Sequence, residues 1–215
     1  MRLRIDGVET RKRILQAAGE VFAARGYRDA TVAEICRRAK ANAAAINYHF
    51  NDKESLYVEV WRHSADEAMR LYPLDGGVPI TAPVKERLHG FLVALLKRMT
   101  DRGRLGMFHR LRMIEMANPS GLIDRVRWQA IQPMRDYIHA LLRELLGPGV
   151  TEQELNYCEL SLVGPCLMAQ MTSHHKLPGS GLGQDLDFET FATHSTDFVL
   201  AGVKAVRSKR VKKGR

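Results

Sequence analysis

The stretch TVAEICRRAKANAAAINYHF (residues 31–50) decides the fold of this chain, because it predicts two short helices joined by a tight turn. Thr31-Val-Ala-Glu34 has the pattern of a capping box and predicts that the first helix begins after Thr31. Residues 40–42 are the predicted turn, and residues 43–50 are a second helix of about two turns. A longer helix, with apolar side chains at helical spacing, precedes this pair; it is predicted to begin near residue 9 and to stop at Gly26.

The rest of the sequence is also typical of helices. Asn51-Asp-Lys-Glu54 has the pattern of a second capping box and predicts a long helix that ends near residue 71. Prolines and glycines between residues 73 and 83 mark a linker. Beyond the linker, helical spacing predicts helices at residues 84–102, 105–118, 121–146, 151–172 and 187–209. The sequence has no alternating apolar pattern of strand length.

These segments predict an all-α protein in which an N-terminal three-helix helix-turn-helix domain precedes a C-terminal helical bundle. The domains are expected at residues 1–62, with the start of a connecting helix, and 63–209, followed by a basic tail at 210–215. The net charge of +9 is concentrated near the two ends, and residues 203–215 contain seven Lys and Arg and no acid. A positive N-terminal region suits a polyanionic partner. The tail is either a solubilising disordered end or an extra source of nonspecific attraction to DNA.

Several classes of protein are disfavoured. The three cysteines are too few and too far apart for a disulfide scaffold, which fits a cytoplasmic protein. No secretory signal is expected, and the longest uncharged run, residues 160–175, is shorter than the ~20 residues of a membrane span. His174 and His175 lack further ligands at metal spacing, so neither a metal nor a cofactor is expected. No catalytic pair stands out, which argues against an enzyme built on a helical bundle.

The predicted helix at residues 43–50 has the chemistry of a helix that reads DNA. It is too short and too polar to be core by itself, although Ile46 and Phe50 anchor it to its domain. The three alanines at its start let the backbone approach a groove closely, and Asn47 can pair bidentately with an adenine edge. The alternative is a small helical bundle with a solvated basic face. The agreement of turn, caps and a short polar helix favours DNA binding.

The sequences TRKRILQAAGEVFAARGYRDATVAEICRRA (residues 10–39) and INYHFNDKESLYVEV (residues 46–60) resemble the DNA-binding domain of the TetR family of transcriptional regulators. The resemblance implies a TetR-like fold, in which the third helix reads the major groove. It also implies DNA contacts at the matching positions, which are Thr31, Asn42, Ala43, Ala44, Asn47, Tyr48, His49 and Lys53.

The turn departs from the family pattern at two positions. Lys40 stands where Gly is usual, so that either Lys40 adopts a positive φ or the turn has a different shape. Asn42 stands where Ser or Thr is usual and is still a good N-cap.

The C-terminal part is similar to one C-terminal subtype of the same family, on the sequences RMIEMANPSG (from Arg112) and SLVGPCLMAQM (residues 161–171). A pocket for an unknown small-molecule effector is expected there, with the candidates Phe108, His109, Arg112, Met113, Met116, Trp128 and Gln170. Methionine and aromatic residues at helical spacing are equally typical of plain core. Glu115 is expected to hold the helix junction near Ser120, through a hydrogen bond or through a pair with an arginine.

The last two long helices predict a homodimer interface, because residues 160–169 are apolar on nearly every side. The candidates are Leu160, Val163, Leu167, Phe188, Phe191, Ser195, Phe198 and Gly202. The alternative is that both helices serve only the protomer's own core. A two-fold dimer places two reading helices about one DNA turn (~34 Å) apart, on a palindromic operator.

The sequence therefore predicts a transcriptional regulator, not an enzyme, that binds double-stranded operator DNA as a homodimer. It is expected to respond to a small-molecule effector and to act as a repressor. The alternative is a DNA-binding protein without a small-molecule effector.

Overall fold

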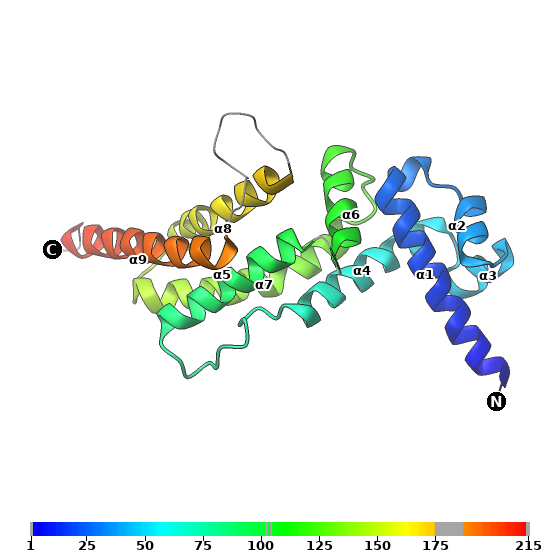
Figure 1. The fold of residues 1–215 in the computed structure, drawn as a ribbon. Coiled ribbons are helices and arrows are strands. Elements are labelled where there is room, and N and C mark those ends of the chain that lie inside the picture. Colours follow the sequence, from blue (N-terminus) through cyan, green and yellow to red (C-terminus); the bar gives the residue numbers. More distant parts are fainter. Residues whose placement is uncertain (1, 102, 104, 175–186, 214–215) are drawn as a thin grey trace. The chain divides into compact units, whose positions relative to one another are not determined.

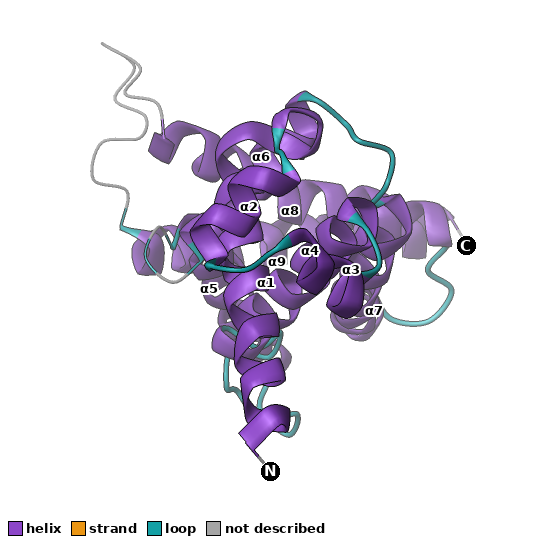
Figure 2. Cartoon of the chain, turned by 90° about the vertical axis from the view of Figure 1, so that its right-hand side faces the viewer, coloured by secondary structure: helices purple, strands orange, loops and turns teal. Residues whose placement is uncertain are grey.

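A computed structural model describes residues 2–101, 103, 105–174 and 187–213 of the chain. These residues form nine α-helices and no β-strand, which confirms the predicted all-α fold (Figures 1 and 2). The helices pack into two compact units. Unit 1 comprises residues 1–68 and 102–130, and unit 2 comprises residues 69–101 and 131–215.

Unit 1 contains the helix-turn-helix region, one helix from later in the chain and the first residues of α7 (Asp124–Leu146), as far as residue 130. Its helices are α1 (Arg2–Asp29), α2 (Val32–Ala39), α3 (Ala43–Phe50), α4 (Lys53–Leu71) as far as residue 68, and α6 (Gly106–Ala117). The limits of α3 are those predicted from the sequence. α1 begins earlier than predicted, and Gly26 (φ 75°, ψ 177°) interrupts its helical geometry at the predicted end. Glycine tolerates this positive φ because it has no Cβ atom.

The core of unit 1 is formed by one apolar face of each helix. Its largest fully buried side chains include Ile14, Phe22, Ile35, Ile46, Leu56, Tyr57 and Leu111. α6 packs against α1, where Met107 lies so close to Gly19 that a side chain at Gly19 would displace it. Leu111 and Ile123, which follow the linker in sequence, thereby complete the core around the helix-turn-helix region.

Side-chain caps set the limits of the two short helices. Thr31 Oγ1 accepts a hydrogen bond from the backbone N–H of Glu34 (3.2 Å), which confirms the predicted N-cap of α2. Asn42 Oδ1 accepts one from the N–H of Ala45 (2.9 Å) at the start of α3. Lys40 adopts φ 49° and ψ 48°, so the first alternative for the turn is the correct one.

The predicted capping box at the start of α4 is wrong in its first residue. Asp52 Oδ1, not the side chain of Asn51, accepts the hydrogen bond from the N–H of Ser55 (2.7 Å). Asn51 has φ 70° and donates its backbone N–H to the carbonyl oxygen of Asn47 (3.0 Å). It therefore ends α3 and does not begin α4.

Unit 2 is a bundle formed by α5 (Val84–Thr100), α7 (Asp124–Leu146) from residue 131, α8 (Glu152–His174) and α9 (Phe188–Lys213). Its largest fully buried side chains include Leu88, Phe91, Leu92 and Leu96 of α5. Arg87 is buried as well, and it pairs with Glu144 (2.5 Å) and donates to the carbonyl oxygen of Ala82 (3.0 Å). In the loop before α5, Gly76 (φ 61°) packs directly against the backbone of Gly90.

The packing groups residues differently from the domains expected at residues 1–62 and 63–209, because residues 102–130 pack with the N-terminal helices. The expected domains stay a prediction about function. The side chains of the expected basic tail, residues 210–215, lie outside the described residues. Among the described helices, none combines the length and the apolar character that crossing a membrane requires.

Candidate nucleic-acid interface

The two faces of α3 differ sharply in exposure. Ile46 and Phe50 are 1% and 6% exposed and fix the helix to the core of unit 1, as predicted. Ala43, Ala44 and Asn47 are exposed, and the Tyr48 side chain is 84% exposed. α3 therefore presents small and polar side chains to the solvent on the face that does not touch its own domain.

Four other predicted DNA contacts surround this face and are held by local interactions. Thr31 and Asn42 are exposed N-caps, so that each marks a helix N-terminus, where backbone N–H groups favour a phosphate. Lys53 begins α4, and its Nζ lies 4.4 Å from the centre of the Tyr27 ring. His49 is partly buried, with its ring centre 4.9 Å from that of Tyr48.

α2 is fastened to α1 by ion pairs. Glu34 pairs with Arg25 of α1 (3.1 Å) and with Arg38 (2.9 Å), and Arg38 also lies 3.8 Å from Glu20 of α1. These exposed pairs contribute little to stability individually. They do fix the orientation of the helix that precedes the turn, and hence the position of α3.

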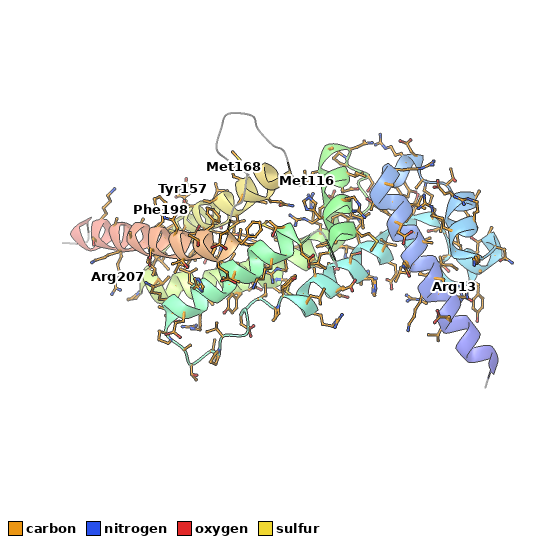
Figure 3. All side chains as sticks on the ribbon, in the orientation of Figure 1. Arg13, Met116, Tyr157, Met168, Phe198 and Arg207 are labelled. Carbon is orange, nitrogen blue, oxygen red and sulfur yellow. The ribbon has the colours of Figure 1, made fainter. Side chains whose placement is uncertain are left out.

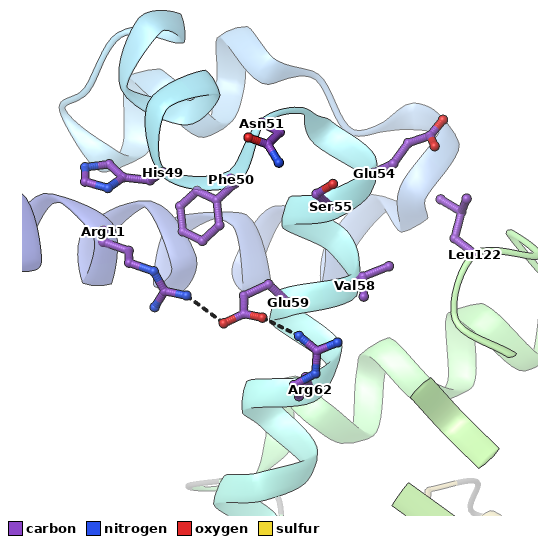
Figure 4. A pocket seen from close by; sticks show the side chains of 10 residues that line it. All are labelled: Arg11, His49, Phe50, Asn51, Glu54, Ser55, Val58, Glu59, Arg62 and Leu122. Carbon is purple, nitrogen blue, oxygen red and sulfur yellow. Dashed lines mark hydrogen bonds and ion pairs between the residues drawn. The ribbon is translucent and has the colours of Figure 1, made fainter. Parts of the chain in front are cut away.

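An open cleft of about 480 Å³ lies beside the end of α3, and the sequence did not predict it (Figure 4). Glu59 of α4 accepts hydrogen bonds from Arg11 of α1 (2.6 Å) and from Arg62 (2.7 Å). The Arg11 guanidinium also lies 5.1 Å from the centre of the Phe50 ring. The cleft is therefore lined by paired charges that support the anchor of α3. Its residues come from α1, α3, α4 and the segments that follow α3 and α6, with no motif in common, so no sequence signal could have found it.

The predicted effector residues are divided between the two units. Six of them belong to unit 1, and Gln170 belongs to unit 2. His109 is buried, and Phe108, Arg112 and Met113 are partly buried. Met116 (62%) and Trp128 (55%) are exposed. Phe108 packs edge-on against Trp61 of α4, with ring centres 5.6 Å apart.

Glu115 joins α4 to the junction that follows α6. It is 3% exposed, and its Oε2 accepts a hydrogen bond from Tyr57 Oη (2.5 Å). Its Oε1 accepts two hydrogen bonds from Ser120, one from the backbone N–H and one from the hydroxyl (2.8 Å each). The hydrogen-bond alternative predicted for Glu115 is thus the correct one, and Tyr57 is a partner that the sequence did not reveal. Burial, and then the bond to Glu115, raise the pKa of Tyr57.

The predicted interface residues of α8 and α9 fall into two groups. Leu160 (70%), Leu167 (36%) and Phe198 (67%) are exposed, and so is Gly202. Val163, Phe188, Phe191 and Ser195 lie wholly or partly against the core of unit 2. Tyr157 and Met168 are further exposed apolar side chains on α8, and both are labelled in Figure 3 with Phe198.

No group of three or more His, Cys, Asp or Glu side chains that could hold a metal ion occurs among the described residues. Of the two histidines considered from sequence, His174 ends α8 without a described side chain, and His175 lies outside the described residues.

Two family profiles match successive parts of the sequence. The profile described as bacterial regulatory proteins, tetR family, matches residues 14–60. The profile of the C-terminal domain of the HTH-type transcriptional dual regulator CecR matches residues 84–203. The first match covers the helix-turn-helix region, and the second covers most of the remaining chain.

Individual proteins agree with these profiles. SrpR, an HTH-type transcriptional regulator of Pseudomonas putida, is 31% identical over 144 residues, which cover 67% of this chain and 64% of SrpR. The regulator TtgW, also of Pseudomonas putida, is 31% identical over 133 residues, which cover 62% of this chain and 94% of TtgW. A regulator from Saccharomonospora viridis, solved in complex with choline, has a TM-score of 0.65 at 20% identity, over 89% of this chain and 96% of that one. At that identity the likeness concerns the fold.

The helix-turn-helix unit, the exposed polar face of α3 and these relatives define a DNA-binding transcriptional regulator. The chain belongs to the TetR family of bacterial regulatory proteins, as the resemblance in residues 10–60 implied. Members of this family regulate transcription and are not enzymes.

Proposed function

We propose that this chain is a cytoplasmic, ligand-responsive repressor that binds a palindromic operator as a homodimer. The observation that carries the proposal is the division of α3 between two buried anchors, Ile46 and Phe50, and an exposed face with Asn47 and Tyr48. A helix with such a face enters the major groove, where an asparagine can bind an adenine edge bidentately. The exposed caps Thr31 and Asn42 would contact the flanking phosphates.

The proposed DNA contacts are tested with a double variant, Asn47→Ala with Tyr48→Ala. The operator is first selected from a random DNA pool at a stated salt concentration, because phosphate contacts make affinity depend on salt. A specific side-chain contact to a base contributes about 1–3 kcal/mol, so we expect the double variant to lose specific binding at least about tenfold. Ile80→Ala, which removes an exposed side chain (75%) from unit 2, is the matched control. Retention of specific binding by the double variant contradicts the proposed reading helix.

The proposed dimer rests on an apolar face that unit 2 leaves uncovered. Leu160, Leu167 and Phe198 are exposed on α8 and α9, and Tyr157 and Met168 of α8 are exposed as well. Figure 3 labels Tyr157, Met168 and Phe198. Exposed apolar surface of this kind is typical of protein interfaces. Two copies of this helix pair would form a four-helix interface and hold two α3 helices for two half-sites.

The dimer is tested by light scattering coupled to size-exclusion chromatography. Phe198→Glu buries a charge in the proposed interface and is expected to yield monomers, whereas Ile80→Glu is expected to leave the dimer intact. The same variant is expected to weaken binding to a full palindrome far more than binding to a half-site. A wild-type chain that elutes as a monomer at micromolar concentration contradicts the proposal.

The proposed effector site comprises the α6 region of unit 1, with Phe108, Arg112 and Met113 partly buried there. The choline complex of a protein with this fold supports the idea that the fold accommodates small molecules. A tenfold loss of operator affinity on effector binding requires about 1.4 kcal/mol of coupling. The competing function, a DNA-binding protein without an effector, predicts that no compound changes the melting temperature and the operator affinity together.

A further inference from the structure

Arg112 of α6 carries a charge that no described residue of the chain neutralises. The side chain is partly buried, and burial lowers the pKa of its guanidinium. Among the described residues, none forms an ion pair or a hydrogen bond with Arg112. The Phe108 ring lies nearby, with its centre 5.9 Å from the guanidinium carbon. The buried Arg87 of unit 2 shows the usual arrangement, because Glu144 neutralises its charge.

The spacing of α6 directs Arg112 toward α4. Phe108, Arg112 and Glu115 are separated by four and three residues, and therefore share one face of the helix. The first and the last of the three both contact α4, since Phe108 packs on Trp61 and Glu115 accepts the hydrogen bond from Tyr57. Arg112 therefore lies between two contacts that join α6 to α4 within unit 1.

A desolvated cation without a counterion is unfavourable. A carboxylate or phosphate group bound beside Phe108 would supply the counterion that none of the described residues gives to Arg112.

We propose that the effector carries a carboxylate or phosphate group, which the Arg112 guanidinium binds. The inference rests on the proposed function, because it names the ligand class of the proposed effector site. Two parallel N–H donors of the guanidinium match the two oxygens of such an anion. The Phe108 ring lies beside the guanidinium and suits an apolar remainder of the ligand. An uncharged analogue leaves the guanidinium unpaired, so the site discriminates against it.

The test compares matched anionic and neutral probes on the full-length chain. Octanoate, 1-naphthoate and phenyl phosphate are measured against octanamide, 1-naphthamide and phenol, by thermal melting and by calorimetry at constant ionic strength. We expect an anionic probe to raise the melting temperature of the wild type, and its neutral analogue to raise it less. Arg112→Met is expected to weaken binding of that anion about tenfold or more, with partial recovery in Arg112→Lys. Arg110→Met, at an exposed position of the same helix, is the control and is expected to bind normally.

The variants and the readouts separate the possible failures. Arg112→Met is expected to fold with an unchanged helical circular dichroism spectrum, because it removes a charge without a partner. Any of three results overturns the anion site. The amide and the carboxylate bind equally, Arg112→Met binds the anion as tightly as the wild type does, or no probe shifts the melting temperature in a way that depends on Arg112. Operator binding is measured in parallel. An uncharged compound that releases operator DNA from both wild type and Arg112→Met supports an effector but overturns its anionic character. An anion that binds through Arg112 without changing operator affinity supports the site and overturns the effector role.

Discussion

Replacing Glu115 with alanine should destabilise unit 1 strongly, because one carboxylate satisfies three donors. The side chain is 3% exposed, so water cannot easily replace the hydrogen bond to Tyr57 Oη. A hydrogen bond to a charged group contributes about 1.5–3 kcal/mol. The two donors of Ser120 are only partly buried, and water recovers part of their energy. Removing the charged group also relieves its own desolvation, so we expect a net loss of about 3 kcal/mol.

Tyr57→Phe removes one of the three hydrogen bonds and leaves the carboxylate with two donors. Its expected loss is about 1.5 kcal/mol, roughly half that of Glu115→Ala. Asp66→Ala, an exposed acid on α4, is the control and should change stability by less than about 0.5 kcal/mol. The double variant of Tyr57 and Glu115 should lose less than the sum of the two single losses, because both remove the same bond.

Urea unfolding followed by tryptophan fluorescence measures these losses selectively. The chain has two tryptophans, Trp61 and Trp128, and both belong to unit 1. The signal therefore reports on this unit, even where the two units unfold separately. A loss below about 1 kcal/mol for Glu115→Ala, or an equal loss for Tyr57→Phe, would refute the reasoning.

Three further predictions concern the anchor of α3, a loop of unit 2 and a buried thiol. Ile46→Ala should lower the free energy of unfolding by about 2–4 kcal/mol through the cavity that it leaves. Tyr48→Ala should leave the urea midpoint nearly unchanged and weaken operator binding in fluorescence anisotropy. Equal urea midpoints for the two variants contradict a helix with one buried and one exposed face. Gly76→Ala should cost about 3 kcal/mol in thermal melting, since its Cβ would strike a backbone carbonyl at positive φ; Gly77→Ala, with open space around it, should cost only about 1 kcal/mol. Burial raises the pKa of the Cys166 thiol to about 12. Mass spectrometry should therefore find Cys166 unlabelled by iodoacetamide at pH 8, while the other two cysteines react. Labelling of all three at an equal rate speaks against the burial of Cys166.

Local signals were enough to predict α3 and its surroundings. Thr31 and Asn42 are side-chain caps that act within three residues, and Lys40 lies in the turn between them. Because these interactions are short in sequence, the pattern of residues 31–50 determines both the helix limits and the exposed face. The one local error, at Asn51, arose because two neighbouring residues can each serve as a cap.

Contacts that are distant in sequence could not be predicted in this way. Tyr57 and Glu115 meet across 58 positions, and nothing in either segment identifies the other. The packing of α6 on α1 places residues 102–130 in unit 1, whereas the sequence was interpreted as an N-terminal domain that ends at residue 62. α9 is apolar on more than one side, so spacing alone could not decide that Ser195 is buried while Phe198 is exposed.

The alanines at the start of α3 have an evolutionary consequence. Ala43 and Ala44 are exposed, and the stability of the helix depends on Ile46 and Phe50 instead. A single substitution at either alanine can therefore add a longer side chain to the exposed face of α3 without disturbing the core. If α3 reads the operator as we propose, new target sequences can arise one mutation at a time, while each intermediate remains a folded protein.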